Sequence, residues 1–246
     1  MKNVVFIVNI KGKYPPDFFE YCFNTWDFWT KKNNALLFVL EDYFDGVRNV
    51  VPHLQKYFAF EVLRKNKIDF DQVAIIDADT MVKWDCPNFF DISENSFRAV
   101  LDDELPKWVI ASLGTYQFLF PKTTVNWWEY FNSGVMVLNK RHAPILSEFV
   151  AFVAAKEAEI SDIHIKSDLR AGFDQTLFNF FIKEKGVPTY YLPKVFNFYH
   201  LEKKKFLEKK GFTECAYIWH FNGIAHVERK RYMQETWELI KENYQQ

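Results

Sequence analysis

The 246-residue sequence has few cysteines, no long apolar run and almost no net charge. Its three cysteines, Cys22, Cys86 and Cys215, lie far apart and form no C-x-x-C pair, which argues against a disulfide framework or a thiolate zinc site and favours a reducing, cytoplasmic setting. No apolar run approaches the roughly 18 residues of a transmembrane helix. The 31 basic and 32 acidic residues give no basic surplus, so we expect no nucleic-acid partner.

The remaining composition is that of a globular protein with a full-sized core, because apolar residues make up 49% and charged residues 26%. No internal repeat, low-complexity segment or Gly/Ser-rich linker interrupts the chain. We therefore expect a single domain over residues 1–246. A nucleotide-binding half of about 1–101 and a second half of about 102–246 would share one continuous core.

Apolar runs and helical patterns alternate along the chain, most regularly in its first half. Strands are predicted at 4–10, 35–40, 73–76, 98–101 and 134–138, with shorter ones at 189–192 and 216–221. Helices are predicted from Pro15 past Trp26 and at 52–65, 143–158, 173–185, 201–210 and 227–243. Runs that are apolar throughout indicate strands covered on both faces. The β-α-β-α-β order predicts an α/β fold with a mainly parallel, nucleotide-binding sheet.

Two carboxylates, Asp77 and Asp79, follow the apolar strand at 73–76. The D-x-D spacing alone means little, since Asp69 and Asp71 repeat it in a polar connector. The carboxyl end of a buried strand, however, is where open α/β sheets bind ligands. Two such carboxylates repel each other unless a cation neutralises them, and Mg²⁺ or Mn²⁺ does so with oxygen ligands. A helix cap or a solvated turn is the alternative interpretation.

The same combination of strand and D-x-D occurs in the haloacid-dehalogenase phosphatases. Those enzymes carry Thr or Val two residues beyond the second aspartate, where this chain has Met81. No later segment supplies a convincing match to their lysine and acidic loop. The phosphatase interpretation is therefore much the weaker one.

Three later segments combine small, amide and ionisable residues at the ends of predicted elements. They read FNSGVMVLN at 131–139, FDQTLFN at 173–179 and WHFNG at 219–223. Small residues at a strand end let a ligand approach the backbone closely. Taken singly, each segment also has an ordinary explanation, namely a turn, a helix cap and a packed core histidine.

In this order after the D-x-D, the segments resemble the motifs of the GT-A glycosyltransferases. The closest match is glycosyltransferase family 8, which includes glycogenin and bacterial galactosyltransferases. The resemblance spans residues 1 to about 226 and consists of four ordered motifs. It implies a GT-A fold, in which a Rossmann-like nucleotide-binding half is fused to a mixed acceptor-binding half. It also implies a UDP-linked sugar donor, Mn²⁺ or Mg²⁺, and transfer with retention to an acceptor that the sequence leaves unidentified.

The resemblance also implies roles for individual residues. Asp77, Asp79 and His220 match the metal ligands, and Asp174 and Gln175 match the residues beside the anomeric carbon. The donor contacts are expected at Asn9, Asp77, Ala78, Asn132, Ser133, Gly223 and His226. The last of these stands where the family has the lysine of a Lys-Pro-Trp segment, which holds the diphosphate. The start of the final helix is the alternative interpretation of that histidine.

Other polar residues carry weaker signals. Lys56 and Arg64 either approach the diphosphate or lie on an exposed helix face, and Asp102 either orients the donor sugar or faces solvent. Two other functions remain open: a nucleotidyltransferase, although residues 9–16 contain only one glycine for a triphosphate loop, and a non-catalytic module that binds sugars or nucleotide sugars.

Overall fold

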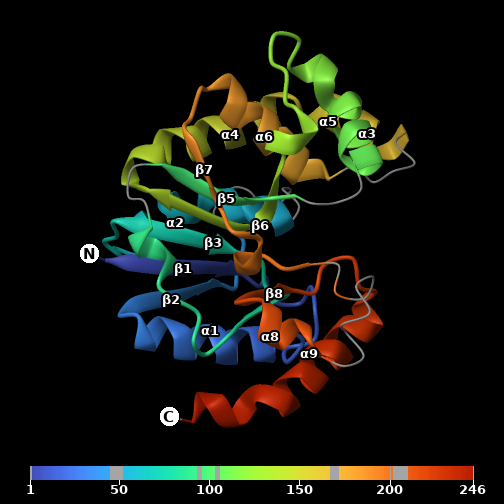
Figure 1. The fold of residues 1–246 in the computed structure, drawn as a ribbon. Coiled ribbons are helices and arrows are strands. Elements are labelled where there is room, and N and C mark those ends of the chain that lie inside the picture. Colours follow the sequence, from blue (N-terminus) through green and yellow to red (C-terminus); the bar gives the residue numbers. More distant parts are fainter. Residues whose placement is uncertain are drawn as a thin grey trace.

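The computed structural model describes residues 2–44, 52–92, 96–102, 106–166, 172–199, 201 and 210–245. Its centre is a six-stranded sheet in the order β2-β1-β3-β6-β5-β7 (Figure 1). The strands are β1 (Asn3–Val8), β2 (Ala35–Leu40), β3 (Gln72–Ile76), β5 (Phe97–Leu101), β6 (Phe131–Asn139) and β7 (Thr189–Leu192). The sheet confirms the predicted α/β architecture.

Strand β6 is the reversed strand of this mostly parallel sheet. β1 pairs in parallel with β2 and β3, and β5 pairs in parallel with β7, whereas β6 is antiparallel to both β3 and β5. Because of this reversal, β6 begins at the edge where β3 ends. The backbone N–H of Asp77 donates to the carbonyl oxygen of Gly134 at 2.9 Å. The D-x-D and FNSG segments, which begin 54 positions apart in sequence, are thereby placed side by side.

A second sheet has two strands, β4 (Thr80–Val82) and β8 (Ile218–His220), which pair antiparallel. Thr80 is opposite His220 in this register. The sequence patterns predicted a strand around β8, whereas β4 has only three residues and gives no periodicity to detect. This short pairing brings the late histidine next to Asp79.

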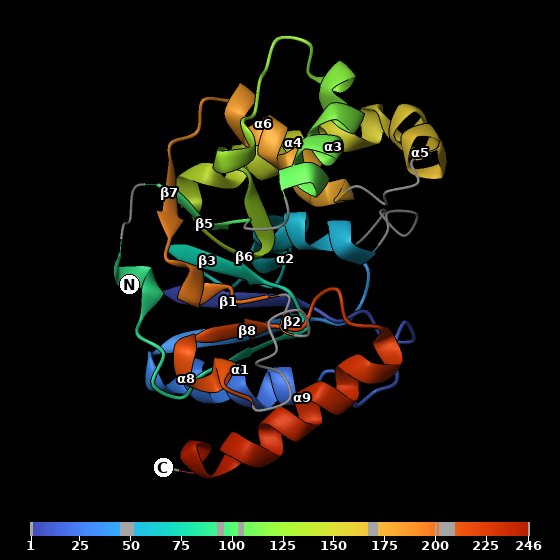
Figure 2. The ribbon, with the colours of Figure 1, turned by 45° about the vertical axis from the view of Figure 1, so that its right-hand side comes forward.

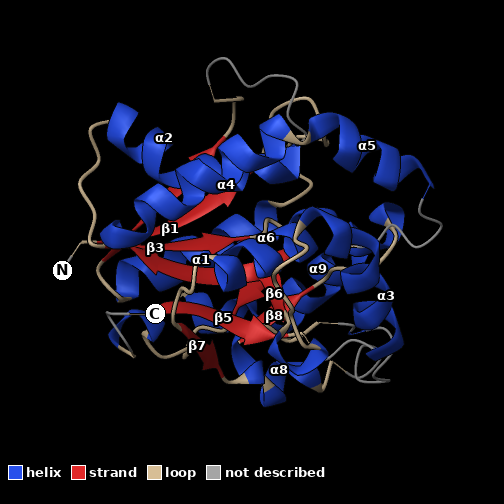
Figure 3. Cartoon of the chain, turned by 90° about the horizontal axis from the view of Figure 1, so that it is seen from above, coloured by secondary structure: helices blue, strands red, loops and turns tan. Residues whose placement is uncertain are grey.

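Helices cover both faces of the central sheet (Figures 1 and 2). On one face lie α2 (Ala59–Lys65), α3 (Pro106–Tyr116), α4 (Ala143–Ala155), α5 (Glu157–Lys166) and α6 (Phe173–Glu184), with α4 and α6 crossing over the strands (Figure 3). On the other lie α1 (Glu20–Lys32), α8 (Phe212–Cys215) and α9 (His226–Ile240). Alternate residues of β1 enter the two cores: Val4 and Phe6 pack on one side, Val5 and Ile7 on the other. Burial on both faces explains the unbroken apolar runs.

Among the described residues, the observed helices differ from the sequence prediction in several places. The helix expected at 143–158 is divided at Lys156 into α4 and α5, the first part of the helix expected at 52–65 is a 3₁₀ helix, and α3 and α8 were not predicted. The helix expected at 201–210 falls almost entirely outside the described residues. Within the described ranges, no helix combines the length and apolar character needed to cross a bilayer.

Candidate functional site

The D-x-D segment forms the turn between β3 and β4, at the carboxyl end of the central sheet. The Thr80 hydroxyl donates to the carbonyl oxygen of Asp77 at 2.8 Å and thereby holds the turn. The Asp77 side chain is 32% exposed and that of Asp79 is 13% exposed. Both carboxylates therefore remain accessible from one side, although the strand before them is buried.

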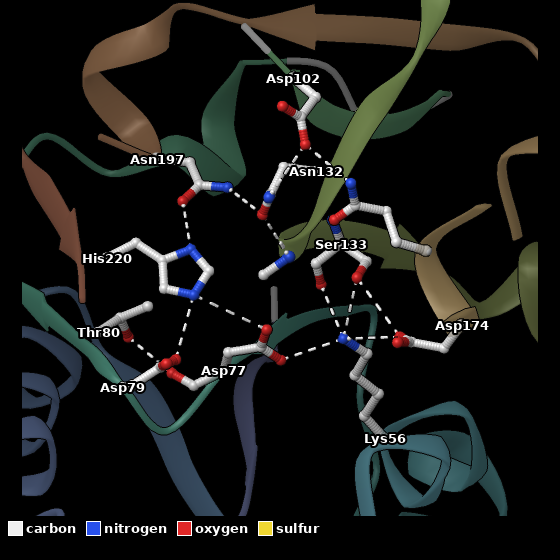
Figure 4. A network of polar contacts seen from close by, with 12 residues as sticks. Lys56, Asp77, Asp79, Thr80, Asp102, Asn132, Ser133, Asp174, Asn197 and His220 are labelled. Atoms are coloured by element: carbon white, nitrogen blue, oxygen red, sulfur yellow. Dashed lines mark hydrogen bonds and ion pairs between the residues drawn. The ribbon is translucent and has the colours of Figure 1, made fainter. Parts of the chain in front are cut away.

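His220 completes a cluster with the two aspartates (Figure 4). Its Nε2 lies 3.1 Å from Oδ1 of Asp79 and 3.9 Å from Oδ2 of Asp77. One ligand atom from each of the three residues lies within 4.8 Å of the others, a spacing that suits a shared metal ion. Two carboxylates and an imidazole are also donors that Mn²⁺ accepts. The three residues therefore fit a divalent cation, as the sequence motifs predicted.

A basic side chain binds the second oxygen of each aspartate. Lys56 Nζ lies 3.1 Å from Oδ1 of Asp77, and Arg229 Nη1 lies 2.9 Å from Oδ2 of Asp79. Burial alone would raise the pKa of Asp79, but its contacts with His220 and Arg229 outweigh that effect and hold the pKa well below its ordinary value. Both aspartates thus keep one oxygen toward His220 while the other oxygen contacts a cation.

Lys56 connects the D-x-D to the start of α6. Its ammonium group, on a residue that is only 4% exposed, lies 3.1 Å from carboxylate oxygens of both Asp77 and Asp174. It also donates to the backbone oxygen and hydroxyl of Ser133, at 3.2 and 3.1 Å. Burial would lower the pKa of Lys56, but the two carboxylates raise it above its ordinary value, so the group stays charged. Of the two interpretations of Lys56 from the sequence, its buried position excludes the exposed helix face.

Asp174 and Gln175 lie at the start of α6 without capping it. Gly172 is the N-cap residue, and no side-chain capping bond is present there. Asp174 instead accepts a hydrogen bond from the Tyr57 hydroxyl at 3.0 Å. Burial would raise the pKa of Asp174, but Lys56 outweighs it and the pKa is lowered. The alternative of a simple helix cap therefore does not describe this carboxylate.

An amide network lies behind the cluster. Gln175 accepts from the backbone N–H of Ser133 at 3.0 Å and donates to Asp102 at 2.8 Å. Asp102 also accepts from Asn132 at 3.3 Å and from the Tyr199 hydroxyl at 2.7 Å. The network thus brings together three predicted site residues and the half-buried Asp102, whose carboxylate accepts hydrogen bonds from three neighbours.

A cavity of about 180 Å³ opens beside the D-x-D. The predicted donor contacts Asn9 and Ala78 line it, together with Lys13 and Tyr14 from the segment that follows β1. His53 and Lys56 line it from the helical segment before α2. Polar strand ends and exposed carboxylates therefore share one concave surface, where a ligand can contact them together.

Gly223 and His226, at and beyond the end of the WHFNG segment, lie outside the cluster formed by the other predicted site residues. Gly223 lies in the turn before α9 with φ of +74°, a conformation that favours glycine. His226 begins α9, where its exposed ring lies 5.5 Å from the ring of Tyr14, and it does not line the cavity. Arg229, three residues later and thus on the same helix face, does line it.

Arg229 was not identified from the sequence. Its Nη2 donates to the carbonyl oxygen of Ile224 at 3.0 Å, which fixes the guanidinium. Its buried Nε has no hydrogen-bond partner among the described residues. None of the sequence motifs includes Arg229, which lies about one helical turn beyond the motif position of His226.

Comparison with known structures finds this fold among glycosyltransferases. A glycosyltransferase involved in glycosylation of the major capsid of PBCV-1 aligns with a TM-score of 0.63 and 12% identity over 96% of this chain and 100% of that one. GlyE of Streptococcus pneumoniae TIGR4 aligns with a TM-score of 0.56 and 14% identity over 99% of this chain and 63% of that one. Mouse xyloside xylosyltransferase 1 aligns with a TM-score of 0.53 and 12% identity over 91% of this chain and 98% of that one.

These likenesses confirm the predicted fold, which is that of GT-A glycosyltransferases. No family model and no curated protein matches the chain. The assignment to glycosyltransferase family 8 therefore stays a prediction.

Proposed function

We propose that the protein is a metal-dependent glycosyltransferase that moves a sugar from a nucleotide-diphosphate donor, UDP-linked as the motifs imply, to an acceptor. The observation that carries the proposal is the convergence of Asp77, Asp79 and His220 beside Asp174 and Gln175 at the carboxyl end of a GT-A sheet. The metal is Mn²⁺ or Mg²⁺, held by the first three residues. When bound there, it supplies a Lewis acid for the leaving diphosphate.

The nucleotide enters through the cavity beside the D-x-D. Asn9 and Ala78 contact its ribose and base from the ends of β1 and β3, since both residues line that cavity. Arg229 contributes a positive charge to the wall of the cavity, held in place by Asp79 and the Ile224 carbonyl, so it is suited to attract a phosphate. Arg229 thereby takes the role that the motif comparison gave to His226.

The transferred sugar lies toward the amide network. Asn132, Ser133 and Gln175 present amide and hydroxyl groups of the kind that hydrogen-bond sugar hydroxyls. As the bond to the diphosphate breaks, positive charge develops on the sugar, and the Asp174 carboxylate and Gln175 amide oxygen stabilise it. Lys56 keeps Asp174 ionised for this task. Retention of the anomeric configuration follows from the motif resemblance.

The test is a panel of nucleotide sugars with purified protein, Mn²⁺ or Mg²⁺, and release of the nucleotide as readout. Asp79→Asn should abolish metal-dependent nucleotide binding and leave the fold intact. Asp69→Asn is the matched control, because it alters an aspartate of the exposed D-x-D at 69–71. Wild-type affinity for UDP and Mn²⁺ in Asp79→Asn would refute the assignment. Nucleotide binding without turnover would favour the non-catalytic module instead, and turnover of nucleoside triphosphates would favour the nucleotidyltransferase.

A further inference from the structure

We propose that Asn197 is a positioning residue that holds His220 in the tautomer with its hydrogen on Nδ1. Asn132 and Asp102 support it, so that the lone pair of Nε2 is directed at the D-x-D carboxylates. The proposal deepens the proposed function and rests on the metal site assigned there. Asn197 belongs to none of the sequence motifs; it follows the 3₁₀ turn Lys194–Phe196 and is fully buried.

The orientation of Asn132 is fixed from two sides (Figure 4). Its Oδ1 lies 2.9 Å from the backbone N–H of Gly134. Because a backbone N–H can only donate, the atom facing it is the amide oxygen. Its Nδ2 consequently faces Asp102 at 3.3 Å, and an ionised carboxylate can only accept. Both neighbours therefore require the same orientation of the Asn132 amide.

That orientation determines the next amide in the chain. Asn197 lies 2.8 Å from Oδ1 of Asn132 and must present its NH₂ group there. Its own oxygen then lies 3.0 Å from Nδ1 of His220. An amide oxygen can only accept, so Nδ1 must carry the hydrogen. The donor and acceptor of every hydrogen bond from Asp102 to the imidazole are thus set by two groups with only one possible role, the Gly134 N–H as donor and the Asp102 carboxylate as acceptor.

The tautomer decides what Nε2 can bind. A neutral imidazole carries one hydrogen, so fixing it on Nδ1 leaves a lone pair on Nε2. That nitrogen lies 3.1 Å from Oδ1 of Asp79, a contact that a ring with hydrogen on both nitrogens makes as a hydrogen bond; in the neutral ring the lone pair faces the carboxylate, and a cation between them takes the place of that hydrogen. A hydrogen bond to the second ring nitrogen of a ligating histidine is the usual device for setting its tautomer and basicity. The network thus prepares the metal-free site for a cation.

A purely structural role for Asn197 makes a different prediction. The backbone of His220 is already held, since its N–H donates to the Phe198 carbonyl at 2.8 Å and β8 pairs with β4. If Asn197 only filled space, an apolar residue of similar size would affect stability at most and leave the tautomer of His220 as it is in the wild type. The tautomer itself therefore separates the two roles.

The first measurement is ¹H–¹⁵N NMR of the histidine rings in metal-free wild-type protein at about pH 9, well above the ordinary imidazole pKa of about 6.5. The His220 signals are assigned by their absence in His220→Asn. We expect hydrogen on Nδ1. Hydrogen on Nε2 would overturn the proposal, and this result needs no variant of Asn197 that folds.

The second measurement is Mn²⁺ affinity, by electron paramagnetic resonance of the free ion. Asn197→Leu removes the acceptor and should weaken Mn²⁺ binding about 10- to 100-fold, the usual effect of losing a partner of a ligating histidine. Asn197→Asp keeps an acceptor at Nδ1, and its second oxygen, when protonated, can still donate to Oδ1 of Asn132, so it should retain binding within about tenfold. Wild-type affinity in Asn197→Leu would overturn the positioning role. If wild-type protein binds no Mn²⁺, the metal site of the proposed function fails, and the tautomer measurement alone decides the inference.

Discussion

Gly134→Ala is the substitution whose effect on the candidate metal site follows most directly from distances in the structure. A Cβ atom at this position of β6 would lie 2.3 Å from Cε1 and 2.8 Å from Nδ1 of His220. Non-bonded carbon atoms approach to about 3.5 Å, so the imidazole would have to move away by about 1.2 Å. Strand β6 cannot yield instead, because it is hydrogen-bonded between β3 and β5 at the centre of the sheet.

Such a displacement exceeds what a metal site tolerates. Metal–nitrogen bonds are near 2.1 Å, and functional sites hold them to within about 0.2 Å. The alanine variant should therefore lose His220 as a ligand and bind Mn²⁺ at least about tenfold more weakly. Overpacking should also lower the free energy of unfolding by about 1 to 3 kcal/mol. The two effects are measured separately, by Mn²⁺ titration and by urea denaturation.

Gly114→Ala is the matched control. Gly114 lies within α3, and a Cβ atom there would meet nothing within 4 Å. This variant should bind Mn²⁺ as the wild type does and gain up to about 1 kcal/mol of stability, because alanine is the better helix former. A folded Gly134→Ala protein with wild-type Mn²⁺ affinity would refute the reasoning, since His220 could then not be the third ligand at this position.

Three further predictions concern single side chains. Asp174→Asn should keep donor affinity but lower turnover at least about tenfold, equivalent to about 1.4 kcal/mol of transition-state stabilisation, measured as nucleotide release. Arg229→Gln should weaken UDP binding in calorimetry about tenfold, whereas His226→Gln should change it little; the reverse order would contradict the assignment of the diphosphate contact. Burial lowers the pKa of His142 to about 4, so protonation favours the unfolded chain and stability falls as the pH drops below about 6.5. Urea denaturation at pH 5 should show a loss of about 2 kcal/mol relative to pH 7.5, and His142→Gln should remove it.

The part of the site that could be predicted from sequence is the part carried by local context. Asp77 and Asp79 were distinguished from Asp69 and Asp71 because an apolar strand precedes them, and the structure places the first pair at a buried strand end and the second on the surface. The order of motifs then predicted that His220 would join them, which the geometry confirms. The identity and presence of the metal stay predictions.

Three features of the site could not be predicted: the direction of strand β6, the role of Asn197, and the residue of α9 that reaches the cavity. An apolar run indicates a buried strand but not whether it runs parallel or antiparallel to its neighbours, so the reversal of β6 had no local signal. Asn197 lies in an irregular segment with no periodicity, and its importance arises only from the two side chains that it connects. His226 matched the motif position in sequence, but Arg229 contacts Asp79 because α9 begins at that histidine and turns once before reaching the cavity.

The two cations at the D-x-D are not equivalent, and under the proposed function this difference would allow one site to hold both a metal and a diphosphate. Lys56 is surrounded by acceptors from Asp77, Asp174 and Ser133, so the protein itself holds it in position. Arg229 holds Asp79 by one nitrogen and the Ile224 carbonyl by another, and it lines the cavity. A metal shared by Asp77 and Asp79 would weaken the attraction of Asp79 for that guanidinium, because the same carboxylate charge would then be divided between two cations. Arg229 would thereby become available to a phosphate as the metal binds, while Lys56 continues to hold Asp174 in place.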